Sequence, residues 1–343
     1  MKTSMNFEAK SIRCNMRNKL SAVIALTFIG FYGNTQQLTQ LSQYHQNHFI
    51  INPAAMGLND EVDLNLSFRQ QWVGFDNAPQ TYYFSGNALL GRKEGAKYNP
   101  SLRTSRRGPV KAPTVATGKI KHAVGGNIMM DKYGPFQRLN FNAAYAIHVP
   151  LSKSMNLSCG LGIGGASLGF DPGKVTMLNA NDGTYASFLG TGGQQQKFLA
   201  DLNTGLYLYS QYLFVGYSTS QVLQQKFNFG DVTQSKLKTH HYILAGYRID
   251  INEDWNIVPN VLVKFMTPSP VAMDINAKAN YLDKFFFGVS YRHKDAVVGF
   301  AGIQYNGFKL GYSYDYTIST LRKQNSGGHE VLVGYKFALH KKK

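Results

Sequence analysis

The feature that most constrains the fold is a two-residue alternation of apolar and polar side chains that recurs along most of the chain. Between positions 308 and 317, aromatic and aliphatic residues occupy the even positions, whereas Lys309, Ser313 and Asp315 occupy odd ones. Residues 139–149 and 271–278 alternate in the same way. Because successive side chains of a β-strand point to opposite faces, each run predicts a strand with one apolar and one polar face.

Strand-like segments follow one another from residue 62 to residue 339. They are 62–72, 79–90, 118–132, 137–151, 154–170, 198–210, 212–222, 238–251, 254–266, 269–282, 284–294, 296–305, 308–318 and 328–339. An even number of strands of about ten residues or more is what a bacterial membrane barrel requires. A soluble β-sandwich has the same period, but the long strands and the lack of a repeat favour a barrel. We therefore predict an all-β fold over residues 61–339: a transmembrane antiparallel β-barrel of about 14 strands in the outer membrane.

Composition and charge narrow the class of protein further. Charged residues make up 16% of the chain, below the roughly 25% of soluble domains, and Tyr, Phe and Gly are abundant. After residue 35 no apolar run is long enough to cross a membrane as a helix. The net charge of +17 is concentrated in residues 1–20, 91–121 and 336–343, and no nucleic-acid-binding motif accompanies it, so we expect no nucleic-acid partner.

The segments outside the strands predict an exported protein. A basic region followed by an apolar stretch from Leu20 to Tyr32 indicates a signal peptide over residues 1–35. We expect residues 36–60 to form an N-terminal periplasmic or plug segment, in which Leu38, Leu41 and Phe49 are spaced as in a short helix. Short connections predict periplasmic turns, and the long segments 171–197 and 223–237 predict surface loops. Residues 340–343 are a basic tail.

One connection departs from this topology, because residues 91–117 form a long, basic and predicted periplasmic loop. Such a charge density holds anionic surfaces, so the loop is either a docking arm for an acidic partner or a solvated insertion. The docking candidates are Arg92, Lys93, Lys97, Arg103, Arg106, Arg107 and Lys111.

No catalytic, cofactor or metal site is predicted. Residues 160–165 match the G-x-G-x-x-G pattern, but they continue a glycine-rich strand instead of opening a helix, as a nucleotide site requires. The histidines show no metal-ligand spacing. His329 and Glu330 are adjacent, so their side chains lie on opposite faces of a strand. We expect a protein that is not an enzyme and that binds no cofactor.

Several short motifs carry a resemblance to a known family. Asn52-Pro53-Ala54 with Gly57 precedes Arg69-x-Gln71-Trp72 and then Pro79-Gln80-Thr81. Near the end, Gly311-Tyr312-Ser313-Tyr314-Asp315 and His329-Glu330 follow. In this order they resemble the PorP/SprF family, outer-membrane proteins of the type IX secretion system of Bacteroidetes. The basic insertion at 91–117 looks longer than the family usually carries.

The resemblance implies an outer-membrane accessory or anchor protein that assists secretion or surface attachment of large adhesin-type cargo, in secretion or in gliding motility. It implies other type IX secretion components and a periplasmic peptidoglycan-binding lipoprotein as partners, beside outer-membrane lipid. Trp72 and Trp255 are expected as aromatic anchors at the membrane interface, and the alternative is that Trp72 and Phe75 form part of a protein-binding surface. The candidate partner-binding residues are Asn52, Pro53, Arg69, Gln71, Trp72, Phe75, Pro79, Gln80, Thr81, Tyr314, Asp315, His329 and Glu330.

Two alternatives remain open from the sequence. The first is a solute-transporting outer-membrane barrel in which residues 36–60 plug the lumen. The second is an outer-membrane lipid hydrolase, since the spatial arrangement of a catalytic triad is not fixed by sequence order.

Overall fold

The computed structural model describes residues 39–58, 61–90, 119–175, 195–229, 233–267 and 269–337. Within these ranges, the residues from 39 to 266 and from 271 to 337 form one compact unit, which contains every described strand. The predicted signal peptide, the basic loop with its docking residues and the basic tail lie outside the described residues. Of the predicted segment 36–60, the structure describes residues 39–58.

The described chain consists of β-strands and a few short 3₁₀ helices. The strands are β1 (Val62–Gln70), β2 (Gln80–Leu90), β3 (Lys121–Tyr133), β4 (Phe136–Pro150), β5 (Met155–Phe170), β6 (Gln195–Ser210), β7 (Leu213–Ser220), β8 (Lys226–Phe229), β9 (Thr233–Lys236), β10 (His240–Tyr247), β11 (Ile249–Asp250), β12 (Trp255–Phe265), β13 (Ala272–Tyr281), β14 (Phe285–Arg292), β15 (Ala296–Tyr305), β16 (Phe308–Thr317) and β17 (Gly328–Phe337). The helices are η1 (Tyr44–Gln46), η2 (His48–Ile50), η3 (Pro53–Ala55), η4 (Pro172–Lys174) and η5 (Thr320–Gln324). None of the helices in these ranges has the length and apolar character needed to cross a membrane.

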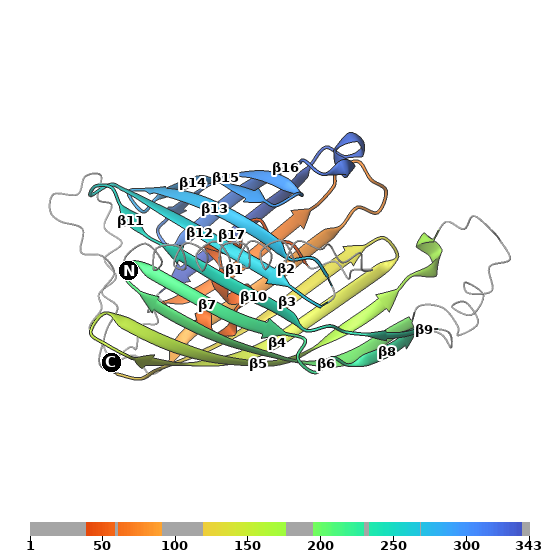
Figure 1. Ribbon diagram of the computed structural model, residues 1–343, viewed down its shortest axis with the longest axis horizontal. Coiled ribbons are helices and arrows are strands. Elements are labelled where there is room, and N and C mark those ends of the chain that lie inside the picture. Colours follow the sequence, from red (N-terminus) through yellow and green to blue (C-terminus); the bar gives the residue numbers. More distant parts are fainter. Residues whose placement is uncertain are drawn as a thin grey trace, which may run out of the picture. The chain divides into compact units, whose positions relative to one another are not determined.

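The large sheet closes on itself. Each strand of this sheet pairs antiparallel with the strands that precede and follow it in the sheet. β7 pairs with β10, and β1 pairs with β17, so the orange first strands lie beside the blue last ones (Figure 1). Both β10 and β11 pair with β12, so they are two pieces of one interrupted strand. Within the described residues the result is a closed antiparallel barrel of 14 strands. This confirms the predicted fold class, and each predicted segment overlaps one strand of the barrel.

The alternation in the sequence corresponds to the two faces of the barrel wall. In β16 the apolar residues point outward, as with Phe308 at 62% exposure, whereas Lys309 and Asp315 point inward at 2% and 3%. Strands β13 and β14 show the same pattern, with Ile275 and Val289 outside and Asn276 and Ser290 inside. An apolar exterior and a polar interior are typical of a membrane β-barrel, whose outer wall contacts lipid.

The two ends of the barrel differ. The connections 151–154, 211–212, 251–254, 282–284 and 306–307 are short, and they share the end at which β1 begins. We call this the short-turn end. At the opposite end, β8 and β9 form a separate two-stranded sheet. The sequence predicts a loop here instead of a hairpin, because strands of four residues are too short to show an alternating pattern.

Candidate functional site: a filled lumen with a buried charge network

Residues 39–58, which we call the plug segment, lie inside the barrel. They fold as η1, η2 and η3 with intervening turns, and Tyr44, Phe49 and Met56 are buried to 2%, 3% and 0% exposure. Side chains or backbone groups of the plug segment form hydrogen bonds with β1, β2, β3, β6, β7, β12, β13, β14, β16 and β17. A segment bonded to strands around the whole circumference is held as part of the folded barrel.

Ser42 of the plug segment lies at the centre of a buried charge network. Its hydroxyl donates to the Asp315 carboxylate at 2.7 Å and accepts hydrogen bonds from Arg69 Nη1 at 2.8 Å and Arg292 Nη2 at 3.0 Å. Its backbone N–H donates to Glu330 Oε2 at 2.6 Å. Four charged residues from four strands therefore meet at one serine of the plug segment.

Within the barrel wall, these charges also pair with one another. Arg69 Nη2 lies 2.7 Å from Asp315 Oδ2, and Arg292 Nη1 lies 3.0 Å from the same oxygen. Glu330 lies directly opposite Arg69 across the β1–β17 pairing, and their side chains approach to 3.6 Å. Removing such charges from water is costly unless they are paired and hydrogen-bonded, and here each charge has both kinds of partner.

The network continues along the next strands of the wall. Arg292 on β14 also lies 3.5 Å from Asp274 Oδ1 on β13, directly opposite in register. Asp274 Oδ2 accepts a hydrogen bond from Lys264 Nζ on β12 at 2.8 Å. The charged belt thus includes residues of β12, β13, β14, β16, β17 and β1, and it joins the first strand to the last.

The Asn52-Pro53 motif fixes the second half of the plug segment. The Asn52 side chain accepts a hydrogen bond from the Ala54 N–H at 2.8 Å, which caps η3, and Pro53 occupies the first helical position. Asn52 Nδ2 donates to the carbonyls of Leu206 and Tyr217 on β6 and β7. One side chain therefore both starts the helix and binds it to the wall.

Two glycines of the wall make room for this motif. A Cβ at Gly160 would collide with the backbone of Pro53 and Ala54, and a Cβ at Gly205 would collide with Asn52 Oδ1. Gly160 begins the G-x-G-x-x-G match, which lies within β5 as the sequence analysis expected. The lack of a side chain at Gly160 permits close approach of the plug backbone.

Two more motif residues are linked to the beginning of the plug segment, Gln71 directly and Thr81 through Asp131. Thr81 Oγ1 donates to Asp131 Oδ1 at 2.7 Å, and the other oxygen of that carboxylate accepts from Thr39 at 2.7 Å. Gln71 Nε2 lies 3.4 Å from Gln40 Oε1. The structure thus brings Arg69, Gln71, Thr81, Asn52, Pro53, Asp315 and Glu330 onto or against the plug segment.

The remaining motif residues lie away from the plug segment. Trp72 and Phe75 are in the β1–β2 loop with their ring centroids 6.5 Å apart, and Trp72 has a left-handed φ of 54°. Pro79 accepts a backbone hydrogen bond from Gln71, and Gln80 accepts one from the Tyr82 hydroxyl. On the outer wall, the Tyr314 and His329 rings lie 5.2 Å apart, and His329 also contacts the Tyr312 hydroxyl at 2.7 Å.

Ser42, Arg292, Asp274 and Lys264 are not among the site residues predicted from the sequence. The three charged residues had a usable signal, because each is a charge at an inward-facing position of an alternating strand. Ser42 had none, since a serine in an irregular segment is common. Among the described residues, no group of three or more His, Cys, Asp or Glu side chains is placed to hold a metal ion.

A closed barrel with an apolar outer wall and an N-terminal segment bonded into its polar interior defines a plugged membrane β-barrel. The family profile for "Type IX secretion system membrane protein PorP/SprF" matches residues 33–335. The chain therefore belongs to the PorP/SprF family and is an outer-membrane protein of the type IX secretion system.

Comparison with solved structures returns other barrels. The toluene transporter TbuX of Ralstonia pickettii is 10% identical with a TM-score of 0.49, over 85% of this chain and 93% of its own. The toluene transporter TodX of Pseudomonas putida is 10% identical with a TM-score of 0.46, over 85% and 94%. The translocator domain of the autotransporter NalP of Neisseria meningitidis is 8% identical with a TM-score of 0.39, over 97% and 98%. No curated protein matches the chain.

Proposed function

We propose that this protein is a non-enzymatic outer-membrane anchor that assists secretion or surface attachment of a large adhesin-type cargo, in protein secretion or gliding motility. Membership of a type IX secretion family supports this role. The observation that carries it is the plug segment, which is fastened to the wall by charges on four strands through Ser42. A barrel whose lumen holds a firmly attached plug segment is a rigid scaffold in the membrane.

The contacts of the plug segment favour an anchor over a conduit for solutes. A mobile plug would need contacts that exchange readily with water. Here Arg69, Asp315 and Glu330 are exposed by 1%, 3% and 0%, and releasing Ser42 from them would leave buried charges with fewer partners. We therefore expect the purified barrel to conduct few ions.

Partners are expected at both ends of the barrel. On the periplasmic side, a peptidoglycan-binding lipoprotein or another component of the secretion machinery would bind the basic loop at 91–117, whose seven Lys and Arg candidates attract acidic surfaces. On the cell surface, the loops would hold the cargo, with Trp72 and Phe75 of the β1–β2 loop as candidate contacts.

The test is an affinity purification of the tagged full-length protein from native membranes in mild detergent, with mass spectrometry of what copurifies. Recovery of a large surface adhesin or of periplasmic secretion components supports the anchor role. Recovery of the barrel alone, together with stable single-channel currents in planar bilayers, would replace it with solute transport. Labelling by a serine-reactive probe would instead indicate a hydrolase.

A deletion tests the basic loop separately. Removing residues 92–113 should leave heat-modifiable barrel migration unchanged, because the strands on both sides remain. It should reduce recovery of the periplasmic partner, whereas recovery of the surface cargo should persist. Unchanged recovery of every partner would exclude the loop as a docking arm.

A further inference from the structure

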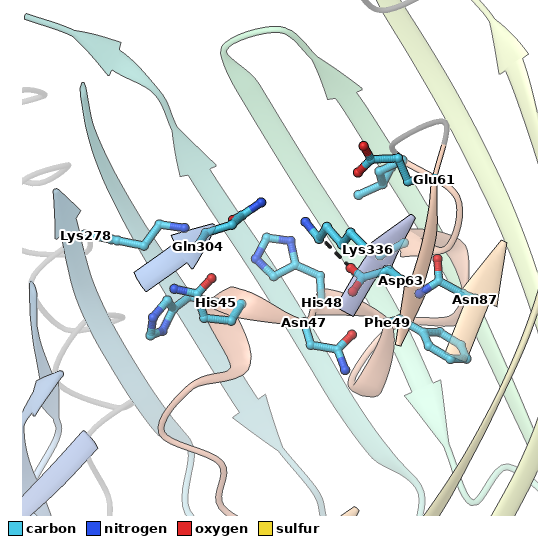
Figure 2. Close-up of a pocket in the computed structure, with 13 residues that line it drawn as sticks. His45, Asn47, His48, Phe49, Glu61, Asp63, Asn87, Lys278, Gln304 and Lys336 are labelled. Atoms are coloured by element: carbon cyan, nitrogen blue, oxygen red, sulfur yellow. Dashed lines mark ion pairs between the residues drawn. The ribbon is translucent and has the colours of Figure 1, made fainter. Parts of the chain in front are cut away.

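Positive and negative charges are mixed at the short-turn end of the barrel. A polar cavity of about 230 Å³ beside the plug segment is lined there by two lysines and two carboxylates. They are Lys278, Lys336, Glu61 and Asp63, and the Lys336 amine lies 3.8 Å from an Asp63 oxygen (Figure 2). The five short turns hold two lysines and three acidic residues. No surplus of one sign selects a ligand at this end.

At the opposite end, the β14–β15 turn and the β16–β17 loop are bonded to each other. The Asp295 carbonyl of the turn accepts hydrogen bonds from the backbone N–H groups of Ile318 at 2.8 Å and Ser319 at 3.3 Å. Within the loop, Asn325 Nδ2 donates to the Leu321 carbonyl at 2.6 Å. The backbone of these two connections is therefore held in one arrangement.

These two connections carry an excess of positive charge. Lys294, Arg322 and Lys323, which we call the cation cluster, are all exposed. Within the described part of the chain, none of the three forms an ion pair with a carboxylate. The one carboxylate of the two connections, Asp295, instead lies 3.3 Å from the buried Arg292. The cation cluster is thus left to bind a negatively charged partner from outside the chain.

The outer wall next to the cation cluster is apolar and aromatic. Tyr291 on β14, Val297 on β15 and Tyr316 on β16 occupy directly paired positions in three neighbouring strands. Their side chains point outward and are exposed by 41%, 41% and 43%. The Arg322 guanidinium carbon lies 5.0 Å from the centre of the Tyr316 ring, within the range of a cation–π contact. The positive charges therefore border the part of the wall that faces lipid.

This combination favours a lipid over a soluble anion. A soluble anion would contact the cations but not the apolar row beneath them, whereas an anionic lipid contacts both. Lys and Arg near a membrane surface attract anionic headgroups, and a guanidinium group binds phosphate oxygens through two parallel hydrogen bonds. Short turns of bacterial membrane barrels face the periplasm, so the opposite end lies at the outer leaflet.

We propose that the cation cluster is a binding site for the phosphate headgroup of an outer-leaflet lipid. Arg322 binds the phosphate while its guanidinium group contacts Tyr316, and Lys294 and Lys323 supply the remaining positive charge. The acyl chains lie along the outward row that includes Tyr291. This site goes beyond the anchor role and does not depend on it.

Native mass spectrometry of the full-length protein in detergent micelles tests the proposal, with dimyristoyl phosphatidic acid as the probe. Dimyristoylglycerol has the same acyl chains without the phosphate, and we expect it to bind at least about fivefold more weakly. Inorganic phosphate at the same concentration should not displace the probe, because it lacks the acyl chains. Equal binding of the two lipids would overturn the proposal. Displacement by phosphate would also overturn it, because the cluster would then bind a free anion.

Variants place the binding at the cation cluster. Arg322→Gln and Lys294→Gln should each weaken binding of the probe by about fivefold, because each removes one cation near the headgroup. Lys174→Gln changes an exposed lysine at the same end but outside the cluster, and it should leave the affinity unchanged. Unchanged affinity in both cluster variants would show that the lipid binds elsewhere. Equal weakening by Lys174→Gln would show attraction to the overall charge and would contradict a defined site.

Discussion

The hydroxyl of Ser42 donates to the Asp315 carboxylate at 2.7 Å, although the two residues are 273 positions apart in the sequence. The same hydroxyl accepts from Arg69 and Arg292, so a small neutral side chain joins three charged ones. This arrangement makes the attachment of the plug segment separable from the stability of the barrel wall, because the charges of the wall also pair among themselves.

Replacing Ser42 by Ala should loosen the plug segment without unfolding the barrel. The substitution leaves two guanidinium groups and one carboxylate short of a partner, which costs about 1–3 kcal/mol. Hydrogen–deuterium exchange should accelerate in peptides from residues 39–58 and stay unchanged in the strands. Ser154→Ala, in an exposed turn, is the control and should alter neither. Equal acceleration in the strands would contradict a separable attachment.

Replacing Arg69 by Met should destabilise the whole barrel. Glu330 and Asp315 would both lose their nearest wall cation, and breaking a buried ion pair from one side costs about 3–5 kcal/mol. Urea unfolding in lipid vesicles, followed by tryptophan fluorescence, measures the decrease in the free energy of unfolding. The double variant Arg69→Met, Glu330→Leu should be less destabilised than the sum of the two single variants, because no unpaired carboxylate remains at Glu330. An additive result would show that the two residues are not coupled.

A side chain at Gly160 should displace the plug segment by steric conflict. In Gly160→Val the new atoms meet the backbone of Pro53 and Ala54, which cannot rotate away as a flexible side chain would. We expect a closed wild-type barrel and a variant with measurable single-channel currents in planar bilayers. Gly299→Val is the matched control, since a Cβ there has open space, and it should stay closed. Currents of the same size in both variants would argue against displacement of the plug.

Attachment of the plug segment should weaken in acid. Burial, followed by the positive charges of Lys278 on β13 and Lys309 on β16, lowers the pKa of His48 from 6.5 to about 3, and the pKa of His45 falls in the same direction. Tyr207 on β6 faces His48 as a hydrogen-bond partner. Between pH 6.5 and about 3 the released segment binds more protons than the attached one, so attachment is strongest above pH 6.5 and declines below it.

Hydrogen exchange of peptides from residues 39–58, corrected for its intrinsic pH dependence, measures this effect. Protection should be constant from pH 8 to 7 and fall by pH 4.5. His48→Gln should flatten the dependence in part, with the remainder due to His45. His293→Gln, on the exposed outer side of a turn, should leave it unchanged. Protection that rises toward low pH would reverse the sign and refute the argument.

The barrel could be predicted from the sequence because its signal repeats in every strand. Each outward position faces lipid and each inward position faces polar groups. The apolar Leu310 and the charged Asp315 therefore indicate their faces of the strand without any knowledge of the rest of the chain. The ends of strands were predicted within a few residues. The β8–β9 hairpin was missed because four residues cannot establish a period.

The site was predictable only in part. Arg69, Asp315 and Glu330 were selected through the resemblance, and the structure shows that they meet at Ser42. Their meeting depends on closure of β1 against β17, which brings together residues from opposite ends of the chain. No local sequence pattern indicates the pairing of β1 with β17. Neither the role of Ser42 nor its hydrogen bond with Arg292 could therefore be inferred from residue spacing.

Bonds between the plug segment and the last strands have a consequence for the order of assembly. The Ser42 N–H binds Glu330, which lies 288 positions later, in the final strand of the barrel. A nascent or truncated chain that lacks β16 and β17 has an N-terminal segment but none of the carboxylates that secure Ser42. The plug segment can therefore become ordered only after β16 and β17 have inserted, so an ordered plug segment indicates a complete barrel. Contacts between residues far apart in the sequence form slowly. The rate at which residues 39–58 become resistant to protease would therefore measure the rate of the final folding step.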